Sequence, residues 1–265
     1  VMTRVYGTLK PLNPNLLGGY FVAGIPALYG ISAYCLNNKK YNFASGSLLF
    51  ALLSTVTLFL TGCRGAFIGM MVIIAGMFAV SAKYLWQNYK QIYLSLVGGV
   101  AAIATFAVML SSSLRARVLS IFAMRQDSSN SFRFNVYQSS FDMFKDNWLL
   151  GIGVGNKNFR EIYGLYMKTG FDALSAYNIY LEIAVESGIF ALIAYMGFLI
   201  TLIKDAVKFI LKSVDTNAVI FVAAALISIC AVSVHGLVDT VFFRPQIQFI
   251  FWTMVAIVRV FIKLI

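Results

Sequence analysis

Long apolar segments alternate with short polar ones along almost the whole chain, and one long polar stretch interrupts the alternation. Each apolar segment is close to the roughly 20 residues that cross about 30 Å of hydrocarbon as a helix. We therefore predict an all-α, polytopic membrane protein with about seven transmembrane helices. The predicted spans are residues 15–35, 43–60, 66–82, 91–110, 178–203, 218–243 and 246–262.

The long polar stretch covers residues 111–177 and is predicted to form one large loop outside the membrane. Within it, Phe134, Phe141 and Phe144 recur at helical spacing, with polar residues between them. This pattern predicts an amphipathic helix over residues 131–145, with the three phenylalanines on one face and Val136 and Tyr137 beside that face.

A glycine-rich segment, Gly151-Ile-Gly-Val-Gly155, follows that helix and precedes a second short surface helix predicted over residues 159–167. Its spacing is typical of a turn. It could also present backbone N–H groups to an anion. Because it follows a helix and not a strand, it is not a dinucleotide-binding motif.

Composition and charge agree with the membrane class. Hydrophobic residues make up 60% of the chain and charged residues only 12%, whereas a soluble domain is typically about half apolar and about a quarter charged. The net charge of +11 is spread singly over the ends of apolar spans, which favours a topological role over nucleic-acid binding. We predict one membrane domain over residues 1–265. Because the chain opens on a polar segment at Val1, we expect it to be the C-terminal part of a longer protein.

The basic residues also predict an orientation. Lysines and arginines in short loops mark the cytoplasmic side. Alternating the spans places four basic groups on one side, and residues 111–177 on the other, which predicts a multi-pass protein of the plasma (inner) membrane with a periplasmic loop. The four groups are Lys39 with Lys40, Lys83 with Lys90, Lys204 with Lys208 and Lys212, and Arg259 with Lys263.

Four ionisable residues lie within predicted spans, where such residues are usually functional and face the bundle interior. Glu182 and Glu186 are one helical turn apart on the fifth span, and His235 and Asp239 are one turn apart on the sixth. His235 could be a general base oriented by Asp239. Alternatively, the two could form a buried pair that ties the sixth span to a neighbour. A single histidine offers too few ligands for a metal site, and no cofactor is predicted.

Three arginines are predicted on the same side as the large loop. Arg64 lies at the turn between the second and third spans, Arg133 near the start of the loop helix, and Arg244 at the turn before the last span. Guanidinium groups gathered in one compartment could clamp a phosphate or another oxyanion. Each could instead be an interfacial anchor that pairs with lipid headgroups.

Several of these segments resemble the O-antigen ligase/polymerase superfamily of membrane glycosyltransferases, over nearly the whole chain. The last of them narrows the resemblance to the cyanobacterial branch named for inorganic-carbon (bicarbonate) transport, the IctB type. The segments are Asn13-Pro-Asn-Leu-Leu-Gly-Gly19, Thr61-Gly-Cys-Arg-Gly-Ala66, Ser129-Asn-Ser-Phe-Arg133, Leu150-Gly-Ile-Gly-Val-Gly-Asn156, Tyr177-Asn-Ile-Tyr-Leu-Glu182 with its continuation to Gly188, and His235-Gly-Leu-Val-Asp239 with Arg244-Pro-Gln-Ile-Gln248.

The resemblance implies a bundle of about ten to twelve spans in the full protein, with outward-facing arginines that hold the diphosphate of an undecaprenyl-linked sugar. Arg64 and Arg133 match the arginine regions. Where the ligases carry a histidine before an Asn-x-x-Leu run, this chain has Tyr177, followed by Asn178. Tyrosine is a poor base at neutral pH, since its unperturbed pKa is about 10.

Two functions from different classes follow. The first is a metal-independent transfer of a glycan from a lipid diphosphate, with Arg64, Arg133, Tyr177, Asn178 and Arg244 binding substrate and Glu186, His235 or Asp239 organising the acceptor. The second is transport of a small anion such as bicarbonate, in which the same arginines form the anion site. A weaker third hypothesis is a membrane assembly partner without activity of its own.

Overall fold

The computed structural model describes residues 5, 13–86, 89–112, 115–116, 119 and 128–264. The chain folds into helices throughout this part, and no strand occurs in it. The predicted all-α class is confirmed. The helices are α1 (Pro14–Asn37), α2 (Tyr41–Leu60), α3 (Arg64–Leu85), α4 (Lys90–Leu110), α6 (Ser128–Asp146), α7 (Asn156–Tyr163), α8 (Ile179–Lys212), α9 (Thr216–His235), the 3-10 helix η2 (Val241–Phe243) and α10 (Pro245–Leu264).

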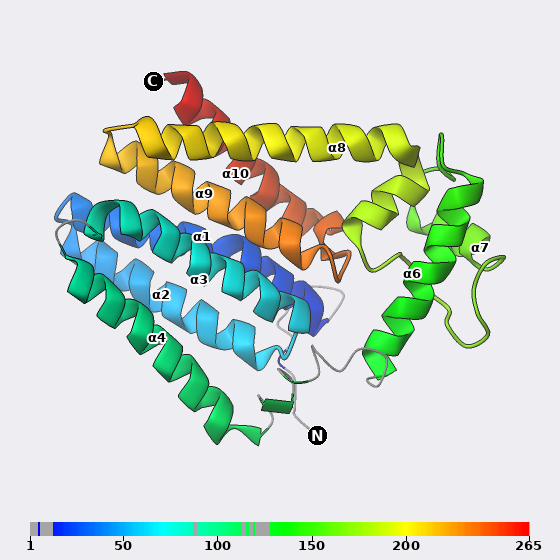
Figure 1. The fold of residues 1–265 in the computed structure, drawn as a ribbon, viewed down its shortest axis with the longest axis horizontal. Coiled ribbons are helices and arrows are strands. Elements are labelled where there is room, and N and C mark those ends of the chain that lie inside the picture. Colours follow the sequence, from blue (N-terminus) through cyan, green and yellow to red (C-terminus); the bar gives the residue numbers. More distant parts are fainter. Residues whose placement is uncertain are drawn as a thin grey trace.

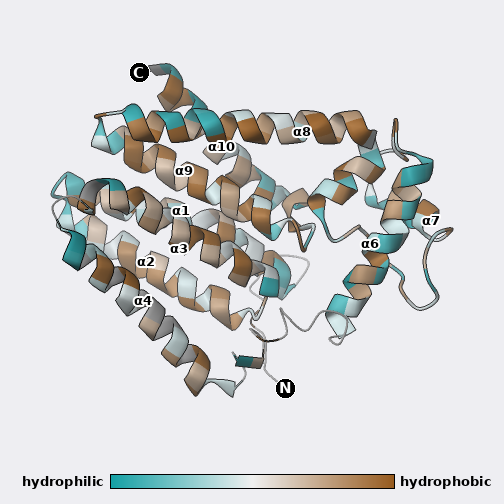
Figure 2. Cartoon of the chain, in the orientation of Figure 1, coloured by the Kyte–Doolittle hydropathy of each residue, from teal (hydrophilic) through white to brown (hydrophobic). Residues whose placement is uncertain are grey.

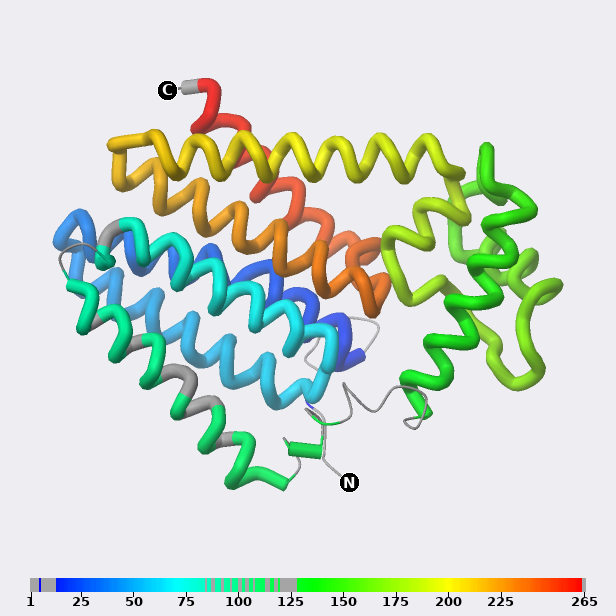
Figure 3. The backbone as a smooth tube through the Cα atoms, viewed as in Figure 1, coloured from blue at the N-terminus to red at the C-terminus, as the bar shows by residue number. Residues whose placement is uncertain are grey.

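Long helices run back and forth side by side, and α6 and α7 sit together at one end of the bundle (Figures 1 and 3). In the described part of the chain six helices are long and apolar enough to cross a membrane, namely α1, α2, α3, α8, α9 and α10. Helix α4 coincides with the remaining predicted span, residues 91–110. We call the end that carries α6 and α7 the loop end, and the opposite end the lysine end.

Helix α9 forms the centre of the bundle. It packs against α1, α3, α8 and α10, and almost three quarters of its apolar stretch is buried. Close approach is possible because glycines face it: a Cβ atom at Gly30 would lie 2.6 Å from the Ala224 Cβ, and one at Gly76 would lie 2.8 Å from the Ile227 Cγ1. Small residues of this kind let helix backbones pack closely in membranes.

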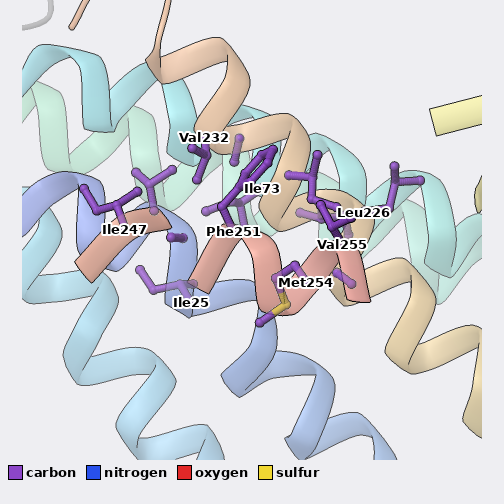
Figure 4. Close-up of a cluster of buried hydrophobic side chains, with 14 of the residues drawn as sticks. Ile25, Ile73, Leu226, Val232, Ile247, Phe251, Met254 and Val255 are labelled. Atoms are coloured by element: carbon purple, nitrogen blue, oxygen red, sulfur yellow. The ribbon is translucent and has the colours of Figure 1, made fainter. Parts of the chain in front are cut away.

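Around this contact, aliphatic and aromatic side chains, mostly from α1, α3, α8, α9 and α10, form the main core, and Figure 4 shows part of it. The helices of the bundle are largely hydrophobic (Figure 2), and many of their large apolar side chains are exposed. Phe43, Phe50 and Phe249 are each more than three fifths exposed. An apolar exterior over an apolar core is the pattern expected of a bundle surrounded by lipid.

The sixth predicted span, residues 218–243, ends earlier than expected. Helix α9 stops at His235, where Gly236 is its C-cap, and residues 237–240 form a turn before η2. A Cβ atom at Gly236 would lie 2.5 Å from the Ile179 Cδ1, so a larger residue cannot occupy this corner. Hydropathy alone did not show the end of the helix, because residues 241–243 are again apolar. As a result, His235 and Asp239 do not share a helical face.

The fifth predicted span is two segments. Helix α8 breaks at Gly188, whose φ of 77° and ψ of −179° lie outside helical conformation, and it then continues without interruption to Lys212. Glu182 and Glu186 precede the break, so they belong to a short segment that packs against the loop and not to the long apolar span. The basic group Lys204, Lys208 and Lys212 lies on the last part of the same helix.

The loop has a small hydrophobic core of its own. The buried residues are Val136, Met143, Phe159, Tyr163, Ala173, Ala176 and Val185, from α6, α7, the following turn and the first segment of α8. Both predicted loop helices are present, as α6 and α7. Of the predicted phenylalanine face of α6, Phe144 packs against this core, whereas Phe134 is 38% and Phe141 50% exposed. The face that is buried carries Val136, Ser139, Ser140 and Met143.

Candidate functional site

Three segments far apart in sequence meet at Asp239, at the loop end of the bundle. The Asp239 carboxylate is buried, with only 9% of its side chain exposed. Its Oδ2 accepts a hydrogen bond of 2.9 Å from Asn15 Nδ2 at the start of α1, and its Oδ1 accepts one of 2.8 Å from the Thr240 backbone N–H. Arg133 Nη2 of α6 lies 3.9 Å from the same Oδ2. The turn after α9 thus connects the bundle to the loop helix.

Arg133 lies beside this carboxylate, and its guanidinium has further N–H donors. Its side chain is 16% exposed, and within the described residues its ion pair is with Asp239 alone. A guanidinium has five N–H donors in a fixed fork. The contact with Asp239 involves one nitrogen of this fork, at 3.9 Å, so it engages only part of the donor set.

Tyr137, one turn after Arg133 on α6, joins the loop to the bundle. Its hydroxyl lies 3.1 Å from the carbonyl oxygen of Tyr177 and 3.3 Å from that of Leu237, and can donate to either. Burial raises the pKa of Tyr137 to about 12, while Arg133 lowers it and the Asp239 carboxylate raises it. The phenol therefore stays neutral over the physiological range and acts as a hydrogen-bond donor.

This contact predicts a pH effect on stability. Because the folded-state pKa of Tyr137 lies above the unfolded value near 10, the neutral phenol stabilises the fold below pH 10. We expect roughly 2 kcal/mol of stability to be lost as the pH rises from about 10 to about 12. Thermal unfolding of the protein in detergent, measured between pH 8 and 12, should show this loss. Tyr137→Phe should flatten the curve in that interval, and Tyr89→Phe, at an exposed position, should not. Parallel curves for wild type and Tyr137→Phe would contradict the assignment.

Tyr177 and Asn178 form the hinge between the loop and α8. Tyr177 has a φ of 50°, uncommon for a residue with a side chain, and its ring packs edge-on against Phe132 at 5.6 Å. Burial raises its pKa, and the nearby Asp239 carboxylate raises it further against the opposing effect of Arg133. Tyr177 is therefore even less suited to be a base than a free tyrosine.

The Asn178 side chain is already used by the fold. Its Oδ1 caps α8 by accepting hydrogen bonds from the N–H groups of Tyr180 and Leu181, and its Nδ2 donates to the Leu237 carbonyl at 3.1 Å. Both polar atoms of the amide thus have protein partners. In this structure Asn178 orients the hinge beside the site, whereas the sequence predicted that it binds substrate.

His235 is buried beneath the site and does not pair with Asp239 through any hydrogen bond that the structure describes. It is 1% exposed, and its Nε2 lies 3.9 Å from Cys63 Sγ. A Cβ atom at Gly65 would lie 2.5 Å from its Cδ2, so the ring fits only because α3 has glycine there. His235 thus packs against the start of α3, whereas the alternative interpretation had a buried His235–Asp239 pair tying the span to a neighbour.

The other two predicted arginines differ in their relation to the site. Arg64 is the first residue of α3 and half-buried, between Cys63 and Gly65, which both lie against His235. Its backbone is therefore at the edge of the site. Arg244 is exposed in the turn between η2 and α10, and no hydrogen bond or ion pair of the described residues connects it with Asp239 or Arg133.

Glu182 and Glu186 bind the backbone of the loop. Glu182 Oε2 accepts a hydrogen bond of 2.5 Å from the Ala176 N–H, and Glu186 Oε1 accepts one of 3.1 Å from the Gly155 N–H. The glycine-rich turn, with positive φ at Gly151, Gly153 and Gly155, therefore packs on a carboxylate of the protein itself. The role predicted for Glu186, organising an acceptor, has no support in these contacts.

Sequence reasoning missed two residues of the site, Asn15 and Tyr137. Asn15 was inside a segment noted for its resemblance, but its amide gave no sign of its partner 224 positions later. Tyr137 was expected only beside the phenylalanine face of α6 and had no predicted role in the site. In the described residues no cluster of three or more His, Cys, Asp or Glu side chains could hold a metal ion.

Comparison with known proteins gives two matches. The family model for O-Antigen ligase matches residues 49–196, more than half of the chain, from α2 through the loop into α8. The chain is also 24% identical over 191 residues to the teichuronic acid biosynthesis protein TuaE of Bacillus subtilis (strain 168). That alignment covers 69% of this chain and 38% of the relative, so the chain spans about two fifths of the length of TuaE.

Proposed function

This chain belongs to the O-antigen ligase family, and from that premise we propose that it transfers a glycan from a lipid-linked diphosphate at the loop end of the bundle. The single observation that carries the proposal is the position of Arg133. It brings a guanidinium from the loop helix to the end of an apolar bundle, 3.9 Å from a buried carboxylate. A lipid diphosphate is complementary to this arrangement, because its apolar chain matches the bundle and its anionic head matches the guanidinium.

The chemistry of such a transfer suits these groups. The bond between the anomeric carbon and the diphosphate oxygen breaks, and a bond from that carbon to an acceptor hydroxyl forms. Negative charge develops on the departing diphosphate, and an arginine fork can accept it through bidentate, charge-assisted hydrogen bonds. We assign this role to Arg133, with Arg64 at the start of α3 as the second cation.

The proton of the acceptor hydroxyl needs a base. Asp239 is the carboxylate next to Arg133, and each of its oxygens accepts one hydrogen bond and has a second lone pair for an acceptor hydroxyl. His235, by contrast, is enclosed by α3. We therefore propose that Asp239 orients the acceptor and receives its proton. Tyr177, kept protonated by burial, can donate a hydrogen bond but not accept a proton from the acceptor.

The relative supports a polymer of the cell envelope as product. TuaE is named for teichuronic acid biosynthesis, and an undecaprenyl-diphosphate glycan is the donor that we propose for this chain. We further propose that the loop is periplasmic and that the protein lies in the plasma (inner) membrane. This proposed orientation rests on the asymmetry of charge, because the short connections at the lysine end carry the lysines and arginines that mark the cytoplasmic side.

Transport of a small anion such as bicarbonate is the alternative, favoured by the resemblance of the last segments of the sequence. The two functions are separated by one experiment on the full-length protein in liposomes. Consumption of an undecaprenyl-diphosphate glycan and uptake of labelled bicarbonate are measured in parallel, with protein-free liposomes as control.

We expect glycan consumption without bicarbonate uptake. Uptake without any glycan transfer would overturn the proposal. The Arg64→Ala variant should lose the activity that wild type shows, since an anion site is required in either case. Unchanged activity of Arg64→Ala would remove Arg64 from the site.

A further inference from the structure

Apolar side chains project outward from the connection between α6 and α7. Trp148 is 52% exposed, Leu149 43%, Leu150 79% and Val154 73%. They are consecutive or nearly so, and they follow Asp146 and Asn147, which end the polar surface of α6. A contiguous apolar patch on an exposed connection marks a surface that contacts another molecule or a membrane. Its neighbours in the fold indicate which of these it contacts.

The patch is fixed at a definite depth against α8. The Ile189 N–H donates a hydrogen bond of 2.9 Å to the Trp148 carbonyl, and a Cβ atom at Gly188 would overlap the Leu149 carbonyl. These contacts are at the break in α8, where its lipid-facing surface begins with Phe190 and Ile193, 65% and 60% exposed. The patch is therefore continuous with the apolar exterior of the bundle.

The length of α8 shows that lipid extends to this level. Residues 189–203 carry no charge and rise about 22 Å as a helix. The next residues, Lys204 and Asp205, mark the interface at the lysine end, and Asp205 Oδ2 pairs with Arg259 Nη1 at 2.7 Å. Because the hydrocarbon is about 30 Å thick, roughly 8 Å of it extends beyond Ile189, toward residues 148–150.

We propose that residues 148–150, together with Val154, insert into the lipid leaflet at the loop end and anchor the loop to the membrane. Tryptophan is a residue that membrane interfaces favour, and Leu149 and Leu150, which follow it, supply apolar area. The anchor fixes α6 crosswise over the end of the bundle (Figure 1) and so sets the height of the whole loop above the lipid. The inference does not depend on the reaction proposed above.

Photo-crosslinking in liposomes of phosphatidylglycerol and phosphatidylethanolamine tests this contact. A benzophenone amino acid is introduced at position 150 or 154 of the full-length protein, and adducts are identified by mass spectrometry. Position 165 is the matched control, because Leu165 is 83% exposed but belongs to the turn after α7, at the edge of the loop far from the bundle (Figure 3). All three positions are exposed, so the label should leave the fold intact.

We expect several-fold more lipid adduct from positions 150 and 154 than from position 165. Equal yields at the three positions, or no lipid adduct at 150, would overturn the proposal. Adducts to another polypeptide in place of lipid would also overturn it, since they would make the patch a protein interface.

Discussion

Replacing Arg133 with alanine is expected to lower glycan transfer by about 100-fold to 1,000-fold, the usual cost of removing a charge-stabilising donor from an active site. Arg133 is the guanidinium that pairs with Asp239, whereas the other cation of α6, Lys145, lies in the last turn of the helix and pairs with Asp142. The measurement is the rate of consumption of an undecaprenyl-diphosphate glycan by the full-length protein in liposomes. The loss should appear in kcat and not only in KM.

Arg160→Ala is the matched control, because Arg160 is an arginine of the same loop. It lies on α7, exposed, and its Nη2 pairs with Asp172 Oδ2 at 3.0 Å, away from the bundle. We expect its activity within about twofold of wild type, since exposed ion pairs contribute little. Arg133→Lys should fall between wild type and alanine, because it keeps the charge but loses the fork. Equal losses for Arg133→Ala and Arg160→Ala would show a general effect of loop charge.

Gly188→Ala should strongly destabilise the fold. A φ of 77° with a ψ of −179° is open almost only to glycine, and forcing another residue there costs about 1–3 kcal/mol. In addition, the new methyl group would overlap the carbonyl oxygen of Leu149. We expect a total loss of about 3 kcal/mol or more, together with release of the loop from α8. Thermal unfolding in detergent and limited proteolysis of the loop measure the two effects.

Gly197→Ala, nine residues later on the same helix, is the control. It distinguishes backbone strain at Gly188 from the general effect of replacing a glycine of this helix with alanine. Nothing lies within 4 Å of a Cβ atom at Gly197, and its backbone is helical. Alanine there should be neutral or stabilising by up to about 1 kcal/mol. If Gly188→Ala were as stable as Gly197→Ala, the break in α8 would not be required by the fold.

The fold was largely predictable because its spans are long apolar runs. Six of the seven predicted spans correspond to helices that can cross a membrane, and α4 lies at the position of the remaining span, residues 91–110. The errors occurred where a tertiary contact overrides hydropathy. Gly188 breaks α8 because the Leu149 carbonyl approaches it, and Gly236 ends α9 because Ile179 packs on it. Neither contact can be read from a local pattern.

The candidate site was predictable only in its charged residues. Arg133 and Asp239 were identified from their chemistry, and the structure brings them to 3.9 Å. The predicted pairing of His235 with Asp239 assumed that one helix carries both residues. In the structure α9 ends at His235, four residues before Asp239. The role predicted for Glu186 stays a prediction: a buried carboxylate can bind the backbone of its own loop as well as a substrate, and here it accepts from the Gly155 N–H. Asn15 and Tyr137 are neutral, so nothing in the sequence distinguished them.

The most direct test of the account is the affinity of the full-length protein for undecaprenyl diphosphate, measured in nanodiscs with wild type and Arg133→Ala. Undecaprenol, which lacks the diphosphate, is the matched ligand. The account predicts that wild type binds the diphosphate more tightly than the alcohol, and that Arg133→Ala loses about tenfold or more of that affinity, the effect of one charge-assisted hydrogen bond. Equal affinity of wild type and Arg133→Ala for undecaprenyl diphosphate would contradict it.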